Sequence, residues 1–140
     1  MYFLDSDTFR LYRDKNQNVL KRISQTPLRD IWISGITVEE NLGGQLDLIE
    51  SIRKGKSHEI LDVPFERLMD LIPLLSRFNL LAYGQEAEDK YRELRQVCRN
   101  VKPMDMRLAA HAIVANKIVV TRNASDFDRI PGVTHIDWSK

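Results

Sequence analysis

The chain has 140 residues, of which 43% are apolar and 29% are charged, with 21 basic and 20 acidic side chains. This size is typical of one ordinary domain, so we expect a single domain over residues 1–140 rather than an enzyme with a separate substrate lobe. The formal net charge of +1 excludes a globally basic nucleic-acid-binding protein, but it leaves room for a locally basic patch.

The sequence predicts neither a membrane span nor an export signal. No apolar run approaches the roughly 20 residues that a membrane-spanning helix needs. The chain has Asp5 and Asp7 but no basic residue before Arg10, which is the wrong polarity for a secretory signal. We therefore expect a cytoplasmic protein. The single Cys98 predicts neither an intramolecular disulfide nor a cysteine zinc site.

Short apolar runs bounded by polar residues predict strands, and apolar residues at helical spacing lie between them. The expected strands are Met1–Leu4, Ile31–Ile33, Leu80–Tyr83, Ile118–Val120 and a weaker Val133–Trp138. The expected helices are a segment opening at Thr37, Phe65–Leu75 with a break at Pro73, Gln85–Val101, and Pro103–Asn116, with Lys54–His58 as a helix–helix loop. This alternation predicts an α/β fold with three layers (α/β/α) and a central, mainly parallel sheet of four to five strands.

Acidic residues fall close to the carboxyl ends of the predicted strands, where open α/β sheets bind their ligands. The four candidates are Asp5, Glu40, Asp105 and Asp126. Clustered carboxylates repel one another unless a cation neutralises them, and oxygen ligands suit Mg²⁺ or Mn²⁺. Such an ion polarises a phosphoryl oxygen and acidifies an attacking water, so the pattern indicates a metal-dependent nuclease.

Each of these acidic residues also has a purely structural explanation. Thr37 and Glu40 have the spacing of a capping box, in which Glu40 would reach back to a backbone amide. Asp105 follows a helix start and would stabilise the helix dipole. Asp5 and Asp126 could cap a short helix or a turn. Only the joint placement of the four residues at one edge of the sheet favours a functional role.

Several motifs follow one another along almost the whole chain. They are Tyr2–Asp7 (YFLDSD), Ile33–Glu40 (ISGITVEE) with Gly44, Met104–Ala112 (MDMRLAAHA), Val120–Phe127 (VTRNASDF), Ile130–Gly132 (IPG) and Trp138. In this order they resemble the motifs of VapC-type toxins in the PIN-domain nuclease superfamily. The resemblance implies a PIN-like fold and a divalent-metal-dependent endoribonuclease.

The resemblance also assigns roles to individual residues. It implies that the four acidic residues are the catalytic and metal-binding residues, with Ser6, Thr121 and Asn123 as supporting residues near the site. Members of the family commonly have Thr-Asn after the first aspartate, where this chain has Ser6 and Asp7, so Asp7 joins the supporting residues. Glu40 fits the family spacing, whereas Glu39 is expected to face solvent.

The resemblance further implies a homodimer and a VapB-like antitoxin whose tail occupies the pocket and the surrounding groove. An apolar stripe of Leu42, Leu46 and Ile49 could line a partner groove, or it could simply belong to the core. The sequence does not decide between these two interpretations.

A local excess of positive charge gives some basis for RNA binding. Residues 90–107 contain six Lys or Arg residues and two acidic residues. Arg92, Arg95 and Arg99 are expected on one face of the predicted helix, where they could contact RNA phosphates. A merely solvated helix face is the alternative.

Three other functions compete with the toxin hypothesis. The segment Asp5–Thr8 has the Asp-x-Asp start of haloacid-dehalogenase-like phosphatases, although Phe9 departs from that pattern. A non-catalytic binding module of the PIN fold is the second alternative, and a nuclease that acts on DNA or in RNA processing is the third. His58 and His111 lie far apart in the sequence and do not predict a rival site.

Overall fold

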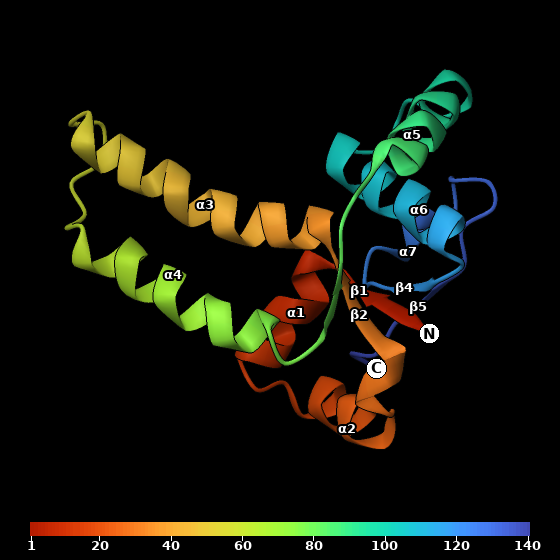
Figure 1. Ribbon diagram of the computed structural model, residues 1–140, viewed down its shortest axis with the longest axis horizontal. Coiled ribbons are helices and arrows are strands. Elements are labelled where there is room, and N and C mark those ends of the chain that lie inside the picture. Colours follow the sequence, from red (N-terminus) through yellow and green to blue (C-terminus); the bar gives the residue numbers. More distant parts are fainter.

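A parallel five-stranded sheet forms the centre of the computed structural model, which describes residues 1–140 (Figure 1). Its strands are β1 (Tyr2–Leu4), β2 (Ile31–Ser34), β3 (Asn79–Leu81), β4 (Ile118–Val120) and β5 (His135–Ile136). They lie in the order β3-β2-β1-β4-β5, and every neighbouring pair is parallel. The chain runs outward from β1 to β3 and then returns to the other side of β1. The switch point of the sheet therefore lies between β1 and β4.

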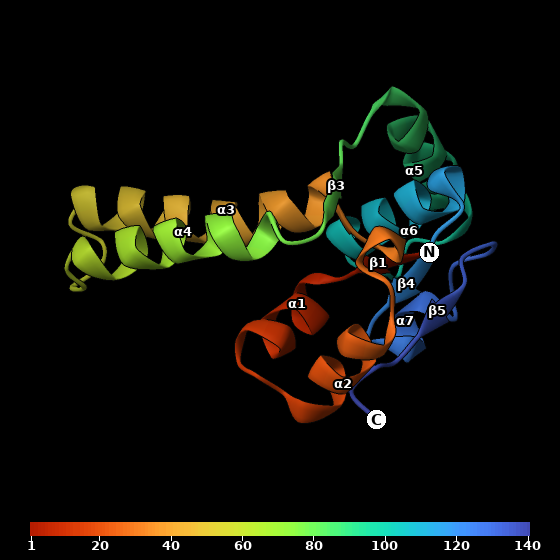
Figure 2. The ribbon, with the colours of Figure 1, turned by 60° about the horizontal axis from the view of Figure 1, so that its bottom comes forward.

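Helices cover both faces of this sheet, so the predicted three-layer architecture is confirmed. They are α1 (Ser6–Arg13), α2 (Gln17–Gln25), α3 (Gly35–Arg53), α4 (Asp62–Leu75), α5 (Gln85–Val97), α6 (Pro103–Ala115) and α7 (Ala124–Phe127), with a 3₁₀ turn at Leu28–Asp30. Figure 2 shows α5 and α6 on one side of the strands and α1 and α2 on the other. None of the helices combines the length and the apolar character that a membrane crossing requires.

Alternate residues of the central strands enter two separate hydrophobic cores. Phe3 and Val119 belong to the core beneath α5 and α6, together with Met106. The next residue of each strand, Leu4 and Val120, belongs to the core on the α1 side. This alternation follows from the pleat of a strand, and here both faces of the strand are apolar because helices cover both faces of the sheet.

Helices α3 and α4 form a long hairpin that projects from the body of the protein (Figures 1 and 2). The connection between Arg53 and Asp62 contains the predicted helix–helix loop. The apolar stripe on α3 is divided: Ile49 is buried and Leu42 packs against the core, whereas Leu46 is 53% exposed. The stripe is therefore neither wholly core nor wholly surface.

The structure corrects several predicted boundaries. The expected break at Pro73 is wrong, because α4 continues through Pro73 and ends at Leu75. The helix expected to reach Val101 ends at Val97 instead. Helix α2 was not predicted, since its sequence is mostly polar and it buries only Val19 fully.

Candidate functional site

Asp5 follows β1 directly and is both a helix cap and a buried carboxylate. Its Oδ1 accepts a hydrogen bond of 2.7 Å from the backbone N–H of Thr8, so Asp5 caps α1. Only 6% of the residue is exposed. Burial raises the pKa of Asp5 above its usual value, and hydrogen bonds from Thr121 and Thr8 oppose this shift only in part. The cap explains the position of Asp5, but it does not relieve the cost of its buried charge.

Glu40 lies on α3 and does not form the predicted capping box, so this structural explanation was wrong. Helix α3 begins at Gly35, and its cap is Ser34, whose Oγ accepts from the N–H of Ile36 at 3.1 Å. The Thr37 hydroxyl donates instead to the Leu4 carbonyl at 3.2 Å, which ties α3 to the end of β1. The helix starts earlier than predicted because the last residue of β2 is already its cap.

The Glu40 side chain reaches across to α1. Its Oε1 accepts a hydrogen bond of 3.0 Å from the Ser6 hydroxyl. The residue is exposed as a whole, yet partial burial of its carboxyl group and the nearby charges of Asp105 and Asp5 raise the pKa of Glu40. Glu39 is also exposed, as predicted, and does not line the cavities described below.

Asn123 holds two acidic side chains together. Its Nδ2 donates to Asp105 Oδ2 at 3.3 Å and to Asp126 Oδ2 at 2.7 Å. Asp105 lies in the first turn of α6, and burial together with the charge of Asp126 raises the pKa of Asp105. The Thr121 Oγ1 in turn accepts from the backbone N–H of Asn123 at 2.9 Å. The segment after β4 thus positions the two carboxylates through one amide.

The acidic residues line one polar cavity of about 220 Å³ at the carboxyl end of the sheet. Its lining consists of Asp5, Ser6, Asp7, Glu40, Lys102, Asp105 and Asn123. Asp126 does not line this cavity and contacts it through Asn123. The cavity lies at the switch point between β1 and β4, where ligands of α/β proteins bind. The structure therefore brings together three of the four predicted acidic residues and places the fourth behind them.

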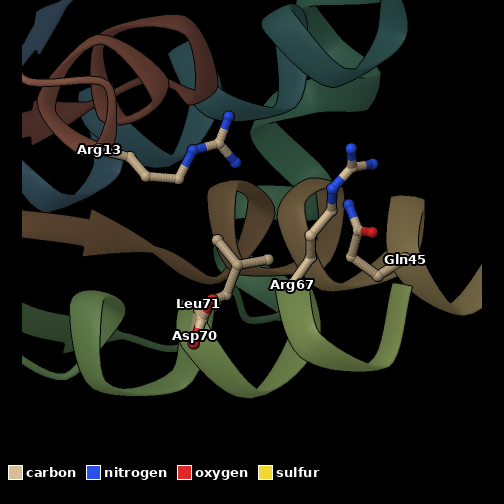
Figure 3. Close-up of a pocket in the computed structure, with 5 residues that line it drawn as sticks. All are labelled: Arg13, Gln45, Arg67, Asp70 and Leu71. Atoms are coloured by element: carbon tan, nitrogen blue, oxygen red, sulfur yellow. The ribbon is translucent and has the colours of Figure 1, made fainter. Parts of the chain in front are cut away.

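A second polar cavity, of about 370 Å³, shares Ser6, Asp7 and Glu40 with the first. Its other lining residues are Arg10, Arg13, Asn41, Gly44 and Gln45. The largest cavity, of about 420 Å³, shares Arg13 and Gln45 with the second and is completed by residues of α4 (Figure 3). The acidic site is thus one end of a groove that runs between α1 and α3 toward α4.

The donor atoms of the acidic cavity fit a hydrated divalent cation. Carboxylate, hydroxyl and amide oxygens are the ligands that Mg²⁺ and Mn²⁺ prefer. No three acidic, histidine or cysteine side chains are already gathered at ligand distances. A fully protein-coordinated ion is therefore a poor fit, whereas Mg²⁺ commonly keeps several waters and takes one or two carboxylates directly. Bound positive charge would also offset the burial and repulsion that raise the pKa of Asp5, Glu40 and Asp105.

The structure corrects the predicted arginine face. Because α5 ends at Val97, Arg99 lies outside the helix and cannot share a helical face with Arg92 and Arg95. The Arg95 guanidinium donates to the carbonyls of Val101 at 3.0 Å and Arg99 at 3.5 Å. None of the three arginines lines the groove. RNA contacts by these residues remain a prediction.

Sequence reasoning missed the basic residues of the groove. Lys102 lies immediately before α6 and lines the acidic cavity, and its position three residues before Asp105 could have indicated this. Arg10 and Arg13 lie on α1 after the first motif, but nothing in the pattern distinguishes them from ordinary surface arginines. His111 is buried against Ser34, with Oγ and Nδ1 separated by 2.7 Å, and it takes no part in the groove.

Comparison with known proteins connects this geometry to one family. The PIN domain family matches residues 2–133. The chain is 28% identical over 142 residues to the tRNA(fMet)-specific endonuclease VapC of Salmonella typhimurium, covering 98% of this chain and 97% of that protein. It is 27% identical over 142 residues to ribonuclease VapC1 of Haemophilus influenzae, covering 100% and 99%. The structure also resembles a chain of the DNA-bound VapBC complex of Salmonella typhimurium, with a TM-score of 0.78, 26% identity and coverage of 98% and 97%.

Proposed function

The chain belongs to the PIN domain family, and from this premise we propose that it is a divalent-metal-dependent endoribonuclease and the toxin of a type II toxin–antitoxin pair. Residues 1–140 would form a single nuclease domain. The observation that carries the proposal is the joint placement of Asp5, Glu40 and Asp105 around one cavity at the switch point of the sheet. Its relatives in Salmonella and Haemophilus carry the names of an endonuclease and a ribonuclease, which supports the same reaction here.

We assign some residues of the site as direct metal ligands and others as residues that orient those ligands. Asp5 and Asp105 are the proposed direct ligands, since both are partly or fully buried and are fixed by hydrogen bonds from Thr8 and Asn123. Asp126 completes the acidic set by orienting Asn123 and by adding negative charge behind Asp105. Thr121 supports this arrangement by accepting a hydrogen bond from the backbone N–H of Asn123, and Asp7 adds a further negative charge to the cavity. A bound Mg²⁺ or Mn²⁺ would polarise the phosphoryl oxygen and lower the pKa of water.

Glu40 is the proposed acceptor of a proton from the attacking water. Its Oε1 is held by Ser6, and its second oxygen makes no hydrogen bond in the structure. Because Glu40 lines the acidic cavity, this free oxygen is available there to accept a proton. Lys102 lines the same cavity and provides a positive charge for a substrate phosphate. The reaction is then direct hydrolysis without a covalent intermediate.

We also propose a VapB-like antitoxin partner and a homodimer. The Salmonella structure that this chain resembles is a VapBC complex, which supports a partner of the same kind. The α3–α4 hairpin exposes large apolar side chains, with Leu46 53% and Met69 63% accessible. Such side chains on a projecting hairpin are suited to a protein interface rather than to water.

Of the three alternative functions, two are disfavoured by separate observations. The match to the PIN domain family over residues 2–133 leaves no support for the phosphatase alternative. A PIN-fold binding module without activity, or an RNA-processing nuclease outside a toxin–antitoxin pair, would share the fold. The retained cavity of Asp5, Glu40 and Asp105 favours an active enzyme over the binding module.

The test is an RNA cleavage assay combined with a metal titration. The purified chain should cleave RNA in Mg²⁺ or Mn²⁺ and should lose that activity in chelator. Calorimetry should detect specific Mn²⁺ binding in the unmodified chain and weakened binding in Asp5→Asn. Cleavage that survives chelation unchanged would exclude the metal mechanism, and the absence of both cleavage and specific metal binding would favour the binding module.

A further inference from the structure

The groove that leaves the acidic cavity changes its charge along its length. Four acidic side chains and Lys102 line the first cavity. The middle cavity has two acidic residues, Asp7 and Glu40, and two arginines, Arg10 and Arg13. The far cavity has Arg13 and Arg67 against the single Asp70. A ligand that spans the groove therefore meets an acidic, metal-binding end and a basic end.

The cations at the far end differ in their availability. Arg10 is paired with Asp7. Arg13 contacts only the exposed carboxylate of its neighbour Asp14, at 3.3 Å. Arg67 makes no ion pair or hydrogen bond within the chain, so its guanidinium is free to bind an anion. Figure 3 shows Arg13 and Arg67 extending into the same space from different helices, with the Gln45 amide beside Arg67.

The same helices carry both ends of the groove, which fixes the distance between them. Helix α1 begins after Asp5 and ends with Arg13, and α3 carries both Glu40 and Gln45. From the helical rise of 1.5 Å per residue, Arg13 lies about 12 Å along its helix from Asp5, and Gln45 lies about 8 Å along its helix from Glu40. This separation suits a phosphate near the scissile one on the same strand.

We propose that Arg13 and Arg67 form a subsite for a backbone phosphate of the substrate RNA, about one to two nucleotides from the bond that is cut. The inference rests on the proposed function and extends it to the path of the substrate. Arginine guanidinium groups bind phosphate with paired, charge-assisted hydrogen bonds, and grooves that bind single strands follow the backbone with such cations.

The lining of the groove suits an RNA strand, and an antitoxin tail in the same groove would have to displace that strand. Leu71 is the only hydrophobic residue among the lining residues of the three cavities. A phosphodiester backbone requires only cations and polar groups from such a lining. A metal site followed along the groove by Arg13 and Arg67 therefore matches a strand with regularly spaced negative charges.

The test measures cleavage of a short RNA by Arg13→Gln, Arg67→Gln and the double variant. Each single substitution should raise KM about ten-fold with kcat nearly unchanged, because the lost contact is not at the reacting phosphate. Arg77→Gln is the matched control, since Arg77 is also exposed and unpaired but lies outside the groove. A second experiment replaces one phosphate of the RNA at a time by a neutral methylphosphonate. At one position beside the cut bond, this replacement should weaken cleavage by the unmodified chain but should have no effect on cleavage by the double variant.

A second pair of variants tests the groove without changing its charge. Gly44 lines the middle cavity, and a Cβ atom added at this position would meet no atom within 4 Å. Gly44→Leu should therefore fold normally and raise KM by obstructing the strand. Gly43→Leu is the control, because Gly43 is equally unobstructed and does not line the groove.

The outcomes separate this subsite from the proposed function. If the unmodified chain cleaves RNA and the arginine variants keep its KM, the subsite is wrong and the function stands. If the unmodified chain does not cleave, RNA binding measured by fluorescence anisotropy decides: weaker binding of the double variant supports the subsite, and equal binding overturns it. If the arginine variants lose affinity only for a protein partner and cleave RNA normally, the subsite is also wrong.

Discussion

The hydroxyl of Ser6 donates a hydrogen bond of 3.0 Å to Glu40, joining the first turn of α1 to α3 across the entrance of the acidic cavity. Neither residue caps the helix on which it lies. Asp5 caps α1, and Ser34 caps α3. The pair therefore holds the Glu40 carboxylate at the cavity, where burial and, to a smaller extent, the negative charges of Asp105 and Asp5 raise its pKa. An acidic residue placed in this way is a candidate for catalysis rather than for stability.

The first prediction compares Glu40→Gln with Glu39→Gln. Glutamine can still accept the hydrogen bond from Ser6, so Glu40→Gln should fold normally. Its loss of charge and basicity should lower kcat for RNA cleavage by at least about 100-fold. Glu39→Gln removes the same charge from the neighbouring exposed residue and should cleave at the normal rate. Near-normal cleavage by Glu40→Gln would remove Glu40 from the catalytic residues.

The second prediction concerns Asn123, which bridges Asp105 and Asp126. Asn123→Ala should weaken Mn²⁺ binding and lower cleavage by about 10- to 100-fold, as substitutions of residues that orient metal ligands commonly do. Ser125→Ala is the control, because the Ser125 hydroxyl makes only a long, exposed contact of 3.4 Å with Asn123. Calorimetry measures the metal affinity independently of activity. Unchanged Mn²⁺ affinity in Asn123→Ala would contradict the bridging role.

The parts of the fold that depend on local pattern could be predicted from the sequence. The strand Ile118–Val120 has the predicted bounds, because its apolar residues are flanked by polar ones on both sides. The start of α3 could not be predicted in this way. Thr37 and Glu40 have the spacing of a capping box, yet β2 passes into α3 without a loop, so that Ser34 ends the strand and caps the helix.

The site was only partly predictable, because its basic residues come from separate elements. Acidic residues near strand ends are a recognisable signal, since parallel strands end at the same edge of the sheet. Arg13 and Arg67 carry no such signal, because they meet only when the α3–α4 hairpin packs beside α1. The position of Asp126 behind Asn123 depends in the same way on side-chain hydrogen bonds that spacing does not reveal.

The third prediction is growth arrest when the chain is expressed in a bacterial host. Asp5→Asn should abolish the arrest, because asparagine caps a helix as well as aspartate does but brings no negative charge to the metal. The Asp5→Asn variant should accumulate in the cell, and its thermal unfolding should be as cooperative as that of the unmodified chain. Co-expression of the protein encoded beside this chain should relieve the arrest if that protein is the antitoxin. Equal toxicity of a folded Asp5→Asn chain would place the cause of the arrest elsewhere.

The fourth prediction links the raised pKa of Asp5 to stability and metal binding. Because the folded state binds this proton more tightly than the unfolded state, the carboxylate of Asp5 destabilises the metal-free fold at neutral pH, and the cost declines as the pH falls through its folded pKa toward 3.8. Asp5→Asn should therefore be more stable than the unmodified chain at pH 7 without metal. This difference should disappear at low pH.

Thermal unfolding with and without Mn²⁺ from pH 7 to pH 4 measures both effects. Mn²⁺ should stabilise the unmodified chain at pH 7 and progressively less at lower pH, because protons compete for the same carboxylate. Asp137→Asn is a control of opposite sign: hydrogen bonds from Ser139 help to lower the pKa of Asp137 in spite of partial burial, so its contribution is present above pH 3.8 and is lost at lower pH. Removing Asp137 should thus destabilise the chain at pH 7 without altering the Mn²⁺ effect. A metal-free Asp5→Asn chain that is less stable than the unmodified chain at pH 7 would show that the Asp5 charge stabilises the fold, and the metal would then not be needed to neutralise it.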